Sequence, residues 1–148
     1  MNKIKIFISY CVQDNDKMEF VKNLINESEK LEPIVVLQQK SNLSYNADKI
    51  IESLKKSTVF LPILTSNSIN NQWVNQEIGF VFGSNSIKIE NIKPIVEKKI
   101  MTKLKGFITA NNDLNYRFES DKDFEIQATT LVSELKEKYK NTGIYHIY

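Results

Sequence analysis

Residues 3–9 read Lys-Ile-Lys-Ile-Phe-Ile-Ser and form the most diagnostic stretch near the start of the chain. Lysine and isoleucine first alternate, and the run then becomes wholly apolar as far as Ile8. Strands that are buried on both faces have this character, and they occur mainly in parallel sheets. The stretch therefore predicts a central parallel strand that ends at Ser9.

Outward from this strand, helical and strand-like patterns alternate. Apolar residues at helical spacing predict helices over 18–28, 47–54 and 124–139, with Pro33 stopping the first helix and Asn46 capping the second. Apolar runs predict further strands at 34–37, 58–64 and 92–96, and a short fifth strand at 107–108. Such alternation predicts an α/β fold, a doubly wound parallel sheet with helices on both faces.

Three predicted loops leave the carboxyl ends of these strands, where ligands bind in doubly wound sheets. They are Tyr10 to Asp16, Gln38 to Asn46, and Thr65 to Gln72. A further helix, carrying Trp73 and Glu77, starts at the third loop. We therefore expect Glu77 to lie near the ligand crevice.

Glu77 is a single acidic residue one helical turn after the only tryptophan. Residues four apart share a helix face, so Glu77 shares one with Trp73, Val74, Phe80 and Val81. The opposite side carries Gln72, Gln76, Gly79 and Gly83. A carboxylate among apolar groups loses hydration and its pKa rises, as often happens at functional sites. The alternative is a structural glutamate held by a backbone amide or a lysine.

Composition restricts the class of protein. With 148 residues, we expect one domain over 1–148. The 20 basic and 18 acidic residues give no electrostatic reason to expect nucleic acid or an anionic membrane as partner. No apolar run is long enough to span a bilayer, and no signal peptide is recognisable. One cysteine, Cys11, suits a reducing compartment, so we expect a cytoplasmic protein.

The residue inventory also argues against several chemistries. His146 is the only histidine, which disfavours a Ser-His-Asp or Cys-His arrangement and, with one cysteine, a zinc site. The first predicted loop has no glycine, which disfavours a phosphate-binding loop of the dinucleotide-binding or flavodoxin type. The strand ends lack the acidic residues that a phosphoreceiver domain needs for magnesium. Any acid or base is therefore expected to be a carboxylate.

Several segments, in order, resemble the boxes of Toll/interleukin-receptor (TIR) domains of the bacterial type. They are residues 7–14, beginning Phe-Ile-Ser-Tyr and ending in Asp14; residues 49–57; residues 64–66; residues 73–78 with Trp-x-x-x-Glu; and residues 92–96. The resemblance covers roughly residues 3–138 and implies a flavodoxin-like, five-stranded parallel sheet. The chain departs from the family by lacking a Pro-Gly pair at residues 42–45 and by having Asn71 where serine is common.

Many TIR domains are NAD+ glycohydrolases, and the resemblance implies this activity here. NAD+ would be the substrate, without a further cofactor, and nicotinamide would leave with ADP-ribose or a cyclic isomer as product. Glu77 would be the catalytic residue. The substrate-binding residues would be Tyr10, Cys11, Ser66, Trp73, Asn42 and Tyr45.

Each of these side chains also has a plainer interpretation. Tyr10 would cover the core at the strand end, Cys11 would be a small apolar filler, and Trp73 would anchor its helix. Ser66 would cap a turn. Residues 42–45 would be a solvated loop, whereas in the functional interpretation they close over substrate or contact a neighbouring subunit.

The resemblance also implies partners and a setting. TIR enzymes commonly self-associate through TIR–TIR contacts, and in bacteria they act in antiphage defence, where the product depletes NAD+ or signals to an effector. Two other hypotheses stay open. One is a non-catalytic TIR adaptor, and the other is a nucleoside deoxyribosyltransferase-like hydrolase.

Overall fold

The computed structural model describes residues 2–36, 43–104 and 116–141; of residues 43–46, 72 and 73 it describes the backbone alone. Its strands are β1 (Ile4–Ser9), β2 (Leu31–Ile34), β3 (Val59–Leu64), β4 (Ile95–Glu97) and β5 (Tyr116–Phe118). They form one sheet in the order β2-β1-β3-β4-β5, and every neighbouring pair is parallel. The predicted α/β architecture, a five-stranded parallel sheet, is confirmed.

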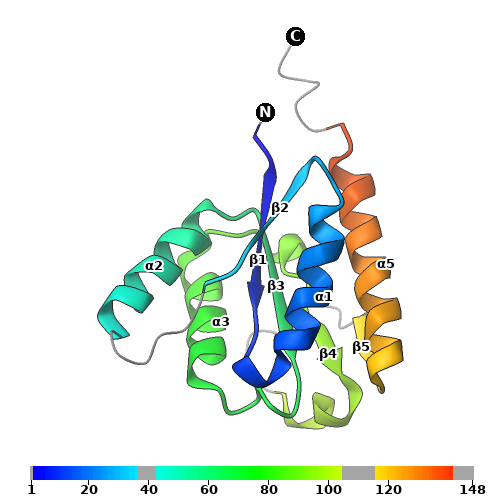
Figure 1. Ribbon diagram of the computed structural model, residues 1–148. Coiled ribbons are helices and arrows are strands. Elements are labelled where there is room, and N and C mark those ends of the chain that lie inside the picture. Colours follow the sequence, from blue (N-terminus) through cyan, green and yellow to red (C-terminus); the bar gives the residue numbers. More distant parts are fainter. Residues whose placement is uncertain (1, 37–42, 105–115, 142–148) are drawn as a thin grey trace.

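Helices cover both faces of this sheet (Figure 1). On one face lie α1 (Asn15–Asn26) and α5 (Asp121–Tyr139), and on the other α2 (Leu43–Lys56) and α3 (Gln72–Ser84). Short 3-10 helices η1 (Val12–Asp14), η2 (Ile89–Asn91) and η3 (Lys98–Lys103) lie in the connections. None of the described helices is both long and apolar enough to cross a membrane.

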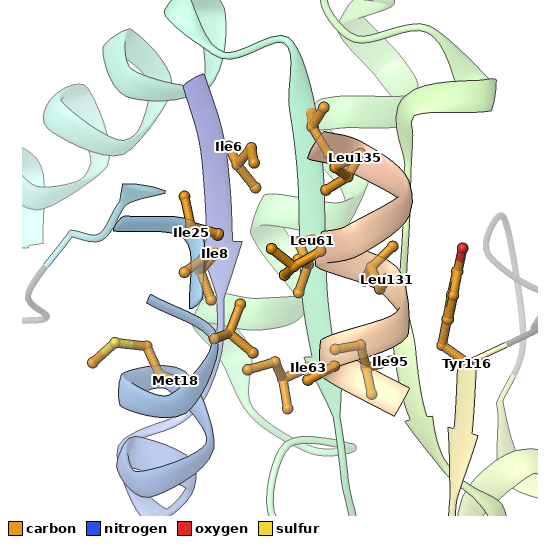
Figure 2. Packing of buried hydrophobic residues seen from close by; sticks show 14 of the residues in the cluster. Ile6, Ile8, Met18, Ile25, Leu61, Ile63, Ile95, Tyr116, Leu131 and Leu135 are labelled. Atoms are coloured by element: carbon orange, nitrogen blue, oxygen red, sulfur yellow. The ribbon is translucent and has the colours of Figure 1, made fainter. Parts of the chain in front are cut away.

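The interior strand β1, which lies between β2 and β3, is buried on both sides because its side chains alternate between the two layers. Ile6 and Ile8 pack with α1 and α5, as Figure 2 shows, whereas Phe7 packs with α2 and α3. Ser9 follows Phe7 by two residues and therefore faces the α2 and α3 layer. This alternation places the Ser9 hydroxyl group against α3, the helix that carries Glu77.

The edge strand β2 differs from its prediction. Residues 34–37 were expected to form it, but it spans Leu31–Ile34, and Pro33 lies inside it rather than stopping α1, which ends at Asn26. Proline is tolerated here because β2 pairs only with β1 and needs no amide donor on its free edge. Leu31, which is completely buried in the core beside α1, fixes the strand in this position.

Two other boundaries were predicted wrongly, and a third prediction is not tested. Helix α2 begins at Leu43, so Asn46 lies within the helix and does not cap it. Strand β4 begins at Ile95, directly after Pro94, and Ile92 lies outside the strand, in an isolated bridge to Phe60. The fifth strand is Tyr116–Phe118, whereas the predicted strand at 107–108 lies outside the described residues.

Candidate functional site

Helix α3 begins where the sequence provides a cap. The side chain of Asn71 accepts a hydrogen bond of 3.0 Å from the Val74 amide, which satisfies one of the free donors of the first turn. Val74 and Val81 are completely buried, and Glu77 between them is 5% exposed. Gln76 and Gly79 are exposed on the opposite side. The predicted position of Glu77 on the buried face is thus confirmed.

The carboxyl group of Glu77 is bound by Ser9 at the end of β1. The Ser9 hydroxyl, 1% exposed, donates a hydrogen bond of 2.7 Å to Glu77 Oε1. Within the described part of the chain, no other hydrogen bond reaches this carboxyl group. Ser9 was not predicted as a site residue from the sequence. Its position two residues after Phe7, on the same face of a buried strand, was the signal that would have found it.

Burial changes the acidity of Glu77. Loss of hydration raises the pKa of its carboxyl group from 4.5 to about 8, and the hydrogen bond from Ser9 opposes this rise. Helix α3 contains no other ionisable residue, so no cation on the same helix offsets the burial. In the free domain Glu77 is therefore largely protonated near neutral pH.

A cavity of about 220 Å³ lies between α2 and α3 and opens beside Glu77. Its described walls are Ala47, Ile50 and Ile51 from α2 and Gln76, Glu77 and Phe80 from α3. Glu77 is the only ionisable residue among these lining residues. The arrangement combines a concave apolar wall with one acidic group, which is typical of small-molecule binding sites.

Tyr10 lies next to Ser9 and is half-buried against the core beside α1. Burial raises the pKa of its phenol, and the negative charges of Glu19 and Glu77 raise it further. Tyr10 is thus within electrostatic reach of Glu77, although it is not among the described residues that line the cavity.

Cys11 lies inside the protein and has no exposed surface. Its Sγ donates to Asp14 at 3.1 Å, and burial together with the Asp14 carboxyl group raises the pKa of the thiol to about 12. The side chain packs with Leu64, Val74, Val96 and Ile100. Cys11 therefore belongs to the core in this structure and does not reach the cavity.

Of the remaining predicted residues, Ser66 is the one whose side chain the structure describes, and it is not among the described residues that line the cavity. Ser66 is exposed on the loop after β3, where its amide donates to Glu97 Oε1 at 2.8 Å. Asn42 lies outside the described residues, as do the side chains of Tyr45 and Trp73. The backbone of Tyr45 is in the first turn of α2, and that of Trp73 in the first turn of α3.

A second buried carboxyl group, Asp14, joins two of the loops at this edge of the sheet. It is 1% exposed, and its oxygens accept hydrogen bonds from Cys11 Sγ, Thr65 Oγ1 and Asn67 Nδ2. The Thr65 amide in turn donates to Ser68 Oγ at 2.8 Å. This network holds the loop after β3, from which α3 starts, against the segment after β1.

The described side chains offer no group of three or more His, Cys, Asp or Glu that is suited to bind a metal ion. Among the described residues that line the cavity, the ionisable group is the Glu77 carboxyl group. In its ionised form, such a group stabilises positive charge on a ligand.

The chain belongs to the TIR domain family, because the model of that family, described as "TIR domain", matches residues 6–132. Among solved structures, the chain is similar to one from the structure of the activated Roq1 resistosome directly recognizing the pathogen effector XopQ (TIR domains). The sequences are 13% identical over 88% of this chain and 84% of that chain, with a TM-score of 0.50. At this identity the similarity defines the fold alone. Comparison with curated proteins gives no match.

Proposed function

We propose that this TIR domain is an NAD+ glycohydrolase, which cleaves the bond between nicotinamide and ribose. The observation that carries the proposal is the position of Glu77. Its carboxyl group is 5% exposed, bound by Ser9, and part of the wall of an apolar cavity. An acidic group with a raised pKa in such a cavity is a recognised feature of catalytic sites.

The reaction suits a single carboxylate. Nicotinamide leaves as a neutral base, so its departure needs no acid, and positive charge develops on the ribose. A carboxylate close to the sugar stabilises that charge, as in glycoside hydrolysis. The apolar walls around Glu77 strengthen the attraction because they exclude water. Water then completes the reaction and gives ADP-ribose, or an adenine nitrogen attacks and gives a cyclic isomer.

Glu77 must be ionised to act in this way, yet burial keeps its pKa near 8 in the free domain. The substrate itself supplies the compensating charge. The nicotinamide ring of NAD+ is cationic, and a positive charge within a few ångströms lowers the pKa of a carboxyl group. Binding of NAD+ thus favours the ionised form, while the empty site stays neutral.

The size of the cavity supports a mode of binding in which it receives one part of NAD+. A cavity of about 220 Å³ is smaller than typical pockets for whole drug-sized ligands. It fits one flat ring such as nicotinamide, with the ribose at its mouth near Glu77. The adenosine half then lies outside this cavity, on the surface of the same copy or of a neighbouring one.

We further propose that the domain self-associates through TIR–TIR contacts. The similar Roq1 TIR domains belong to a resistosome, and a second copy would complete the surface for the adenosine half. The expected setting is a cytoplasmic antiphage signalling system, in which loss of NAD+ or a product acting on an effector gives the response.

The test is chromatography of NAD+ incubated with the protein at high concentration. Wild type is expected to release nicotinamide, and Glu77→Gln and Glu77→Ala to lose at least about 100-fold in rate. Glu125→Gln, the same change at an exposed position of α5, is the matched control and should retain activity.

Circular dichroism and thermal unfolding would establish that the Glu77 variants are folded. No nicotinamide from wild type at any protein concentration would overturn the proposal, as would full activity of folded Glu77→Gln. A non-catalytic adaptor would then be favoured. Release of bases from deoxynucleosides instead of NAD+ would favour the deoxyribosyltransferase-like alternative.

A further inference from the structure

Ser9 is rigidly placed by the sheet. It is the last residue of β1, which lies between β2 and β3, and it is in register with Pro62 of β3. With 1% of its surface exposed, the hydroxyl has little access to water and needs a partner inside the protein. That partner is Glu77 Oε1, at 2.7 Å.

Glu77 is less constrained than Ser9 because a glutamate side chain has three rotatable bonds. Its backbone is held by Val74 and Val81, which are completely buried on the same face of α3. The carboxyl group itself has one hydrogen-bond partner among the described residues, the Ser9 hydroxyl. Without this bond the apolar surroundings would not fix the direction of the two oxygens.

Among the described residues, Tyr10, which directly follows β1, has a phenol whose pKa is raised above 10.0, in part by the charge of Glu77. Strand β3 and the wall residues Ala47, Ile50 and Ile51 of α2 carry no charge, and α3 has no other ionisable residue. Among the described groups here, Glu77 alone is therefore expected to titrate between about pH 6 and pH 9.

We propose that Ser9 is a positioning residue for Glu77. Its hydroxyl holds Oε1 from the sheet, stabilises the ionised carboxylate, and leaves Oε2 available to a ligand in the cavity. This inference rests on the proposed function for its effect on catalysis, whereas the coupling of Ser9 to Glu77 is measurable without substrate. Ser9 touches no reacting atom and acts through Glu77 alone.

The experiment compares wild type with Ser9→Ala, Ser9→Thr and Ser9→Cys. The titration of Glu77 is followed in the free protein by NMR of carbon-13-labelled glutamate carboxyl groups, assigned with Glu77→Gln. Nicotinamide release is measured as kcat and KM across the same pH range. Ser57→Ala is the matched control, because Ser57 is also buried and its hydroxyl donates to Ser53 O at 2.8 Å, away from the cavity.

Ser9→Ala is expected to raise the pKa of Glu77 by about one unit and to lower kcat/KM near pH 7 about tenfold. The loss should lie mainly in KM, because bound NAD+ already favours the ionised carboxylate, and the pH profile of kcat/KM should move upward with the NMR titration. Ser9→Thr, which keeps the hydroxyl, should restore both, and Ser57→Ala should alter neither. If Ser9→Ala does not fold, Ser9→Cys replaces it as the test variant, because cysteine is nearly the same size as serine and its thiol is only a weak hydrogen-bond donor.

An unchanged Glu77 titration in folded Ser9→Ala or Ser9→Cys would overturn the inference. An equal loss of kcat at all pH values, not restored by Ser9→Thr, would also overturn it, since a general structural defect has that signature. If the titration shifts but wild type releases no nicotinamide, the coupling of Ser9 to Glu77 stands and the proposed function fails.

Discussion

The hydroxyl of Thr65 donates a hydrogen bond of 2.5 Å to Asp14, which lies 51 positions earlier in the chain. Asn67 donates to the other oxygen of the same carboxyl group at 3.0 Å. Two contacts from the loop after β3 thus converge on one buried residue after β1. Because α3 starts from that loop, Asp14 helps to determine where the helix carrying Glu77 begins.

Replacement of Asp14 is expected to destabilise the fold. Asp14→Ala leaves the donors of Cys11, Thr65 and Asn67 without their acceptor and should lower the free energy of unfolding by about 3 kcal/mol. Urea denaturation followed by circular dichroism measures this loss. Asp16→Ala, at an exposed position in the first turn of α1, is the control and should cost less than about 1 kcal/mol. Equal effects of both changes would contradict the role of the network.

Cys11 should be unreactive in the folded protein. Its thiol has no exposed surface and a pKa of about 12, so very little thiolate is present between about pH 7 and pH 8. An aromatic disulfide reagent should therefore modify native protein at least about 100-fold more slowly than protein in denaturant. The single cysteine makes the assay specific to this position. Rapid modification of the native protein would show that the segment after β1 opens readily.

The raised pKa of Glu77 should make stability fall as pH rises. The unfolded chain releases the proton near the ordinary value of 4.5, whereas the folded protein keeps it up to about pH 8. Between these values unfolding releases one proton, so this residue lowers the free energy of unfolding by about 1.4 kcal/mol per pH unit. Above about pH 8 both states are ionised and the contribution is constant.

Glu77→Gln has no proton to release and isolates this effect. The free energy of unfolding of the variant minus that of wild type should increase between about pH 5 and pH 8, by a few kcal/mol in all, and then level off. Urea denaturation at several pH values gives the difference directly. A difference that does not depend on pH would mean that Glu77 is ionised, or exposed to water, throughout this range.

Filling the cavity between α2 and α3 should block substrate without damaging the fold. Ala47 lines the cavity from α2, and Ala47→Phe would place a ring inside it. We expect nicotinamide release to fall at least about tenfold while the melting temperature changes by only a few degrees. Lys49→Phe places the same aromatic side chain at an exposed position of α2 and should leave activity intact. Activity of Ala47→Phe equal to that of wild type would place the substrate elsewhere.

The sequence was sufficient for the parts of this fold that depend on local pattern. The apolar runs of β1 and β3 and the spacing around Glu77 are visible in any reading of the chain, and the structure agrees with them. Strand β2 was misplaced because its limits depend on pairing with β1, where Pro33 lies opposite Ile6. A strand's register is a property of two segments together.

The site was predictable only in part for the same reason. Glu77 could be identified from its own helix, but its partner Ser9 is 68 positions away and becomes relevant only when β1 and α3 meet. Asp14 was seen as part of a family box, yet its contacts with Thr65 and Asn67 depend on how two loops pack. Cys11 was assigned to the pocket from its place in the same box, although its position after β1 buries it completely.

The alternation of β1 has a consequence for how this domain can evolve. Ile8 and Ser9 are adjacent but face opposite layers. Ile8 packs in the core beside α1 and α5, whereas Ser9 donates a hydrogen bond to the Glu77 carboxyl group on α3. A single codon inserted within Ile4–Ser9 would exchange the two faces and set Ile8 against the acid, whereas a single deleted codon would set Tyr10 there. The contact between Ser9 and Glu77 therefore constrains the length of β1 as well as the identity of residue 9.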